Sequence, residues 1–135
     1  MKRTWQYLLA VFFAAGLIFL SACGGGSTYD RTLMKVASDL NETCPMMVDS
    51  ETRLDNAVAL PDNFFQYNYT MVNYARADLD IDVLTRTLTE QITAMVRTSP
   101  DLQNFRDNHV TMIYAYKDMN GEHITKVTVT PEANN

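Results

Sequence analysis

Two stretches of the chain carry apolar residues at three- and four-residue spacing, which gathers them on one side of a helix. The first predicts a helix over 29–43, with its stripe at Leu33, Val36, Ala37 and Leu40. The second predicts a helix over 80–98, with its stripe at Ile81, Leu84, Leu88, Ile92 and Met95. Ser99 and Pro100 fit the N-cap and the first position of a further short helix over 99–107.

Four other stretches alternate between apolar and polar residues and predict β-strands. They form two pairs, 52–60 with 64–74 and 110–116 with 124–130, and a turn-forming segment joins each pair. The expected apolar faces are Leu54, Val58 and Leu60 in the first strand, Phe65, Tyr67, Tyr69 and Met71 in the second, and Val110, Met112, Tyr114 and Tyr116 in the third.

The order of these elements is helix, two strands, one or two helices and two strands, which predicts an α+β fold. We expect an antiparallel sheet of about four strands, built from two hairpins, with the N-terminal helix and the one or two central helices packed on one face. Residues 29–131 are long enough for a single domain with a modest core, and residues 132–135 form a polar tail.

The first 22 residues have the composition of an export signal. Lys2 and Arg3 supply positive charge, and the run 7–20 is almost entirely apolar. This run is shorter than the ~20 apolar residues of a membrane-spanning helix, and small residues follow it. The pattern therefore predicts an exported protein from which residues 1–22 are removed.

The signal ends in Leu20, Ser21, Ala22 and Cys23, a motif that resembles the lipobox of bacterial lipoproteins. The resemblance implies that the Cys23 thiol is diacylated, with chains such as palmitate, that cleavage precedes Cys23, and that the new amino group is acylated in turn. Two or three chains would hold the protein firmly in a membrane, because each buried CH₂ contributes ~0.8 kcal/mol. An ordinary secretory signal with a chance cysteine, or an uncleaved apolar anchor, is the alternative interpretation.

Residues 23–28 are expected to form the lipidated cysteine and a flexible, glycine-rich tether. The residue after Cys23 is Gly24, whereas an Asp at that position tends to retain lipoproteins in the inner membrane of Gram-negative bacteria. The resemblance therefore implies the outer membrane in such an organism. In a Gram-positive organism, the same anchor implies the outer face of the cell membrane.

Charge and cysteine content narrow the possible partners. Without residues 1–22 the chain keeps nine of its eleven basic residues and all sixteen acidic ones, which gives a formal charge of −7. This acidity argues against a nucleic-acid partner and leaves the lipid on Cys23 as the contact with the membrane. Cys44 then has no cysteine partner, so we interpret it as a small buried hydrophobe; a thiol for an intermolecular bond, or a redox or metal role, is the alternative.

Neither a catalytic motif nor a cofactor motif stands out along the chain. Asp78, Asp80 and Asp82 look like the start of a calcium loop, but Val83 and Thr89 occupy the positions where such a loop needs Gly and Glu. The N-terminus of a helix explains these acids instead. We therefore expect a protein that is not an enzyme and that has no cofactor and no metal.

The candidate partner surface consists of Tyr67, Tyr69, Tyr114 and Tyr116, which lie on two of the predicted strands. Tyrosine combines a large apolar ring with a polar tip, so it is common at protein interfaces. It is equally ordinary as packing material in a sheet. Sequence alone leaves both interpretations open.

The runs 45–55, 67–70 and 114–118, with Gly121 and Ile124, resemble a set of small uncharacterised exported bacterial domains. That resemblance implies no activity. Our main hypothesis is a lipid-anchored envelope protein that binds another envelope protein, as an assembly or secretion accessory. The alternative is a small-ligand-binding protein or an enzyme with a polar cleft at Asp49, Glu51 and Arg53.

Overall fold

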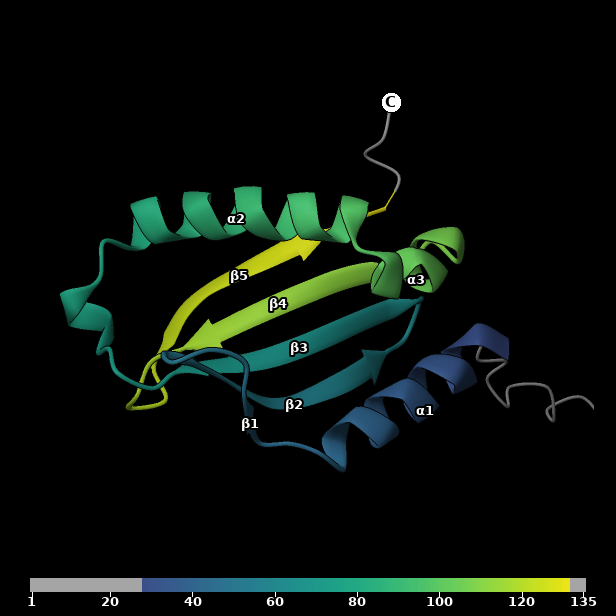
Figure 1. The fold of residues 1–135 in the computed structure, drawn as a ribbon, viewed down its shortest axis with the longest axis horizontal. Coiled ribbons are helices and arrows are strands. Elements are labelled where there is room, and N and C mark those ends of the chain that lie inside the picture. The colour runs from purple at the N-terminus through teal and green to yellow at the C-terminus, as the bar shows by residue number, and fades with distance from the viewer. Residues whose placement is uncertain (1–27, 132–135) are drawn as a thin grey trace, which may run out of the picture.

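The computed structural model describes residues 28–131, which form a five-stranded sheet with its helices on one face (Figure 1). The elements, of which η1 and η2 are short 3-10 helices, follow one another as α1 (Thr28–Asn41), β1 (Met46–Met47), β2 (Thr52–Leu60), β3 (Phe64–Met71), η1 (Arg76–Asp78), α2 (Ile81–Thr98), η2 (Pro100–Leu102), α3 (Gln103–Asp107), β4 (Thr111–Lys117) and β5 (His123–Val129). The α+β class predicted from the sequence is confirmed.

The sheet differs in two details from the expected antiparallel arrangement of about four strands. Its order is β1-β2-β3-β4-β5, and the short strand β1 adds a fifth member beside β2. The second difference is that β3 and β4 pair in parallel, while the other pairs are antiparallel. Segment 72–110 crosses the sheet through α2 and α3 and returns the chain to the end where β3 began (Figure 1). Alternation in the sequence identifies the two faces of a strand, but it does not identify the neighbouring strand.

The strand register places the predicted apolar residues of β3 and β4 on the helix-covered face. One row across the sheet joins Ala57, Tyr67, Tyr114 and Val127, and the next joins Ala59, Phe65, Met112 and Val129. Leu33 and Ala37 of α1 and Ile92 and Val96 of α2 belong to the same buried cluster as these rows. Both long helices therefore cover the same face, α1 over β2 and α2 over β5.

A β-bulge in β2 changes which residues of this strand reach the core. The register shifts between Leu54 and Asn56, so the extra residue Asp55 lies on the open face beside Asn56. Leu54 and Ala57 are buried, whereas Val58 is 40% exposed. The predicted single face of Leu54, Val58 and Leu60 is therefore wrong, because a bulge adds one residue and reverses the alternation after it.

Polar side chains fix the ends of the two long helices. The amide of Asn41, at the end of α1, donates to the Ala57 carbonyl oxygen (2.8 Å) and accepts from the Ala57 N–H (2.7 Å). Asp80 caps α2, since its Oδ1 accepts from the Val83 N–H at 3.0 Å. Among the helices of residues 28–131, none is both long enough and apolar enough to cross a membrane.

Candidate protein-binding groove

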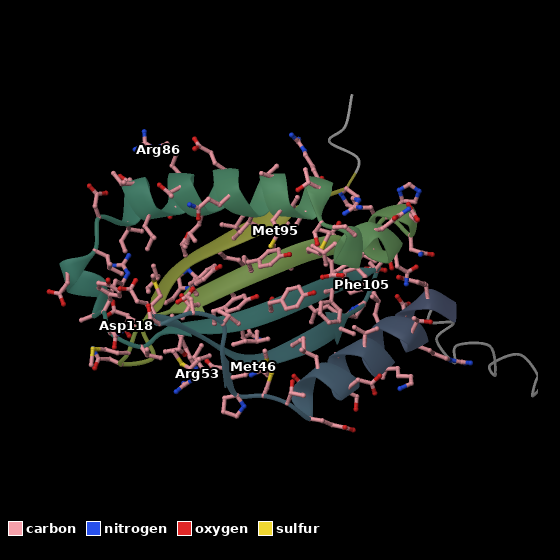
Figure 2. All side chains as sticks on the ribbon, viewed as in Figure 1. Met46, Arg53, Arg86, Met95, Phe105 and Asp118 are labelled. Atoms are coloured by element: carbon pink, nitrogen blue, oxygen red, sulfur yellow. The ribbon has the colours of Figure 1, made fainter. Side chains whose placement is uncertain are left out.

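A groove of about 340 Å³ lies on the helix-covered face, between α2 and the segment that joins β1 to β2. Its floor consists of Tyr69, Tyr114 and Tyr116, and its walls consist of Val48, Asp49, Thr52 and Met71 on the β1–β2 side and Leu88, Gln91, Ile92 and Met95 on α2. Met95 extends from α2 over the sheet, whereas Arg86 on the same helix points away from it (Figure 2). We refer to this feature as the tyrosine groove.

The four tyrosines predicted as a partner surface stack in a row along β3 and β4. The parallel register sets Tyr67 opposite Tyr114 and Tyr69 opposite Tyr116. The ring centroids of these pairs are 5.1 Å and 5.0 Å apart, with interplanar angles of 21° and 15°. Because the ring faces are used in the stack and side chains stand roughly perpendicular to a sheet, the rings present their edges and hydroxyls to the groove.

A phenylalanine pair closes the row of tyrosines toward α3. Phe65 meets Tyr67 edge-on at 5.0 Å and Phe105 at 5.1 Å. Phe65 and Phe105 are buried in the core. The tyrosines therefore combine both interpretations that the sequence left open: they pack against one another, and three of them line a groove.

The hydroxyls of Tyr67, Tyr69 and Tyr116 donate and accept no hydrogen bond within residues 28–131, and they remain in contact with solvent. The Tyr114 hydroxyl reaches only the sulfur of Met112, at 3.8 Å. Burial raises the pKa of Tyr67 to about 12, and burial followed by the charge of Asp49 raises the pKa of Tyr116 to about 12. At neutral pH each hydroxyl is therefore protonated and can both donate and accept.

The walls of the groove are largely apolar and partly open to solvent. Val48 is 47% exposed and Met95 is 42% exposed. Asp49 is the one charged residue among those that line the groove in the described part of the chain. Hydrogen bonds to its carboxylate, first from the Glu51 N–H, lower the pKa of Asp49, so this charge persists at neutral pH.

The three residues of the alternative polar cleft do not converge. Asp49 caps its own turn, and Glu51 accepts a hydrogen bond from the Tyr74 hydroxyl at 2.7 Å. Arg53 lies on the opposite face of the sheet, where its Nε donates to Asp55 at 2.6 Å (Figure 2). Only Asp49 lines the tyrosine groove, so the predicted cleft of Asp49, Glu51 and Arg53 is not formed.

The open face of the sheet carries a polar network of its own. Gln66 donates to Asn68 and Asn68 donates to Asn56, each over 2.7 Å. Asp55 accepts from Thr70 (2.6 Å) and pairs with Arg53 (2.6 Å) and Lys117 (3.3 Å). Burial alone would raise the pKa of Asp55, yet these hydrogen bonds outweigh it and the pKa is lowered.

Of the two cysteines, only Cys44 lies within the residues that the structure describes. Cys23, the predicted lipidation site, lies outside the described residues. Cys44 is a half-buried free thiol whose pKa is raised by burial and then by the charge of Asp55. Within residues 28–131, no group of three or more His, Cys, Asp and Glu side chains could hold a metal ion.

Sequence reasoning did not identify the α2 wall of the groove. The spacing of Leu88, Ile92 and Met95 predicts an apolar stripe that faces the core, and Ile92 does lie there. Met95 belongs to this stripe but is 42% exposed, and it lines the groove together with Gln91.

Residues 27–125 match the family described as Domain of unknown function (DUF8479). The chain belongs to this family. No curated protein matches this DUF8479 chain in sequence.

Solved structures that share this fold include a secreted protein and two pilotins of type 2 secretion systems. A predicted secreted protein (PA3611) from Pseudomonas aeruginosa matches the DUF8479 chain with a TM-score of 0.63 and 12% identity, over 78% of this chain and 95% of that one. The pilotin EpsS of the Vibrio vulnificus type 2 secretion system matches with a TM-score of 0.59 and 13% identity, over 76% and 87%. The type II secretion system pilotin AspS from Vibrio cholerae matches with a TM-score of 0.57 and 14% identity, over 76% and 89%. At such identities the likeness is one of fold.

Proposed function

We propose that this chain is a lipid-anchored accessory protein of the bacterial cell envelope, and that it binds another envelope protein of a secretion or assembly system through the tyrosine groove. The observation that carries the proposal is the groove itself, where protonated hydroxyls without protein partners lie between exposed apolar walls. Tyr and Met are enriched at the cores of protein interfaces, and Met adapts to varied partners.

Two further observations support the envelope and secretion context. Leu20 to Cys23 carry the lipobox-like motif, which would attach the mature chain to a membrane. Two of the proteins that share the fold are pilotins of type 2 secretion systems. The proposal assigns no catalytic step, and it includes the outer membrane as the location in a Gram-negative host because Gly24 follows Cys23.

Site-specific photo-crosslinking in living cells tests the proposal. A crosslinking amino acid at Gln91, on the exposed wall of the groove, should trap one envelope protein, and the same amino acid at Thr128, on the open face, should not. Equal crosslinks from both positions, or none from Gln91, would contradict the proposal.

A matched pair of variants links the trapped protein to function. Met95→Arg places a charge on the groove wall, whereas Val83→Arg places one at a similarly exposed apolar position of α2 outside the groove (42% and 48% exposed). We expect Met95→Arg to abolish the Gln91 crosslink and to impair secretion or assembly in the host cell. Val83→Arg should preserve both the crosslink and this activity.

A further inference from the structure

A second hollow, of about 240 Å³, lies near the start of α1, beside the turn that joins β2 to β3. Its lining consists of Asp30 and Met34 on α1 and of Ala59, Leu60 and Pro61 at the end of β2. Met34 is 63% exposed, and Pro61 is exposed as well. We refer to this feature as the α1 hollow, and it shares no lining residue with the tyrosine groove.

Apolar side chains continue from the α1 hollow along the neighbouring strands. Val58 lies on the same side of β2 as Leu60 and is 40% exposed, and Phe64 is the register partner of Leu60. Asp30 is the one charged residue among those that line the hollow in residues 28–131, and Arg31, which follows it, carries the opposite charge. A contiguous exposed apolar patch of this kind marks a contact site, and apolar contact rather than net charge would select its occupant.

The α1 hollow lies close to the predicted lipid anchor. The Tyr29 hydroxyl donates to the Asn104 carbonyl oxygen at 3.3 Å, which holds the start of α1 at the α3 end of the sheet (Figure 1). Five peptide links separate Cys23 from Thr28, the first residue of α1, and a chain of that length spans at most about 18 Å. Met34 lies about 9 Å along the helix axis from Thr28. A bilayer that holds the acyl chains of Cys23 is therefore within reach of the hollow.

The tether favours this bilayer over other apolar occupants. Linkage through a short segment makes the contact intramolecular, with an effective concentration of the order of mM, so even a weak contact forms. A second copy of the chain would have no such advantage. An acyl chain of Cys23 that left the bilayer for the hollow would lose ~0.8 kcal/mol for each CH₂ that the protein does not cover, and the exposure of Met34 and Pro61 shows that the hollow is open to solvent.

From these observations we infer that the α1 hollow docks on the surface of the bilayer. Met34, Leu60 and Pro61 contact the boundary of the acyl chains, and Asp30 stays at the level of the headgroups because a carboxylate is costly to bury in hydrocarbon. This inference rests on the lipid anchor of the proposed function and adds a second, protein-made contact with the membrane.

The docked end and the tyrosine groove lie at different positions along the sheet. Phe64 pairs with Leu60 at the α1 hollow, and Tyr69 follows five residues later in β3. Five residues of a strand span about 17 Å. Docking at the hollow therefore leaves the tyrosine groove accessible to a protein partner.

The test uses the processed, lipidated chain in phosphatidylcholine vesicles, with a photo-crosslinking amino acid at Met34 in one preparation and at Met119 in another. The two side chains are similarly exposed (63% and 56%), but Met119 follows β4 at the opposite end of the sheet. We expect mass spectrometry to find a phospholipid adduct from Met34 and none from Met119. The Met34 adduct should persist at high salt, because screening weakens charge attraction and not apolar contact.

A substitution measures the apolar contribution to docking. With the crosslinking amino acid at Pro61, Met34→Gln removes an apolar side chain without adding charge, and it should lower the phospholipid adduct about threefold or more. Met119→Gln is the matched control and should leave the adduct unchanged.

Several outcomes would overturn the inference and leave the proposed function standing. They are an adduct of Met34 with the chain's own acyl groups alone, equal adducts from Met34 and Met119, loss of the adduct at high salt, and no adduct from a chain that floats with the vesicles. A chain that does not float with the vesicles would overturn both the inference and the anchor. A normal Met34 adduct without the Gln91 crosslink in cells would support the inference and contradict only the proposed groove.

Discussion

The two faces of the sheet differ in how their polar side chains are satisfied. On the open face, Asn68 bonds Asn56 and Thr70 bonds Asp55, so groups that water could reach are already paired with one another. On the helix-covered face, Tyr69 and Tyr116 keep hydroxyls for which residues 28–131 supply no partner. The more enclosed face is therefore the one with unused hydrogen-bonding capacity, which is why we assign the partner to it.

The largest expected contrast comes from two adjacent phenylalanines of β3 that face opposite sides of the sheet. Phe65 is fully buried against Tyr67 and Phe105, whereas Phe64 is only half-buried on the open face. We expect Phe65→Ala to lower the free energy of unfolding by about 3–5 kcal/mol and Phe64→Ala by about 1 kcal/mol. Urea unfolding followed by circular dichroism measures both, and equal losses would show that the two faces contribute alike.

Alkaline pH should destabilise the tyrosine stack. Tyr67 and Tyr116 have pKa values raised from 10.0 to about 12, because burial disfavours the phenolate. The unfolded chain therefore loses these protons first, and the stability they contribute is complete below pH 10 and is lost as pH rises toward 12. Each shift corresponds to about 2–3 kcal/mol. Tyrosinate absorbance that rises only with unfolding would support this, whereas titration of all tyrosines near pH 10 in the folded protein would contradict it.

Acid should destabilise the polar network on the open face. The pKa of Asp55 lies below its ordinary 3.8, since hydrogen bonds from Thr70 and Arg53 outweigh the effect of burial. The stability from Asp55 is therefore present above about pH 4 and is lost as pH falls through the folded pKa. We expect Asp55→Ala to cost about 1–2 kcal/mol at pH 7, and Asp39→Ala, which breaks an exposed pair with Lys35, to cost about 0.5 kcal/mol or less. Similar losses in denaturant titrations would mean that the network contributes no more than a surface pair.

The smallest expected difference in stability is between two neighbouring hydroxyls of β3, one on each face of the sheet. Tyr69→Phe removes a hydroxyl without a partner and should change stability by about 0.5 kcal/mol or less. Thr70→Val, at the next position of β3, removes the hydroxyl that donates to Asp55 and should cost about 1 kcal/mol. Calorimetric unfolding of the two variants tests this, and a large loss for Tyr69→Phe would reveal an internal role for its hydroxyl.

Alternation and capping made much of the local structure predictable. The faces of β3 and β4 followed from Phe65 to Met71 and from Met112 to Tyr116, because the side-chain period of a strand is two. Asp80 was placed correctly at the start of α2 by its charge. These signals are local, so a single sequence carries them in full.

The groove depended on relations that are not local. The parallel pairing of β3 and β4 stacks Tyr67 on Tyr114, and no turn signal specifies it. The bulge at Asp55 places Asn56 on the same face as Arg53 and turns Val58 out of the core. The residue types identified the candidate side chains for a site, whereas the long-range strand pairing determined which of these side chains lie next to one another. The lipid on Cys23 and the boundaries of the single domain stay predictions.

The parallel pair at the centre of the sheet also affects when the tyrosine groove can form during folding. The tyrosines of β3 and β4 are separated in sequence by the whole of 72–110, so the pairing of these two strands closes a long loop. Contacts between such distant segments form slowly, because loop closure precedes the gain from packing. The groove that we propose as the binding site is therefore complete only when β3 and β4 have paired. If the proposed function holds, a chain in which β3 and β4 have not yet paired would not bind its partner.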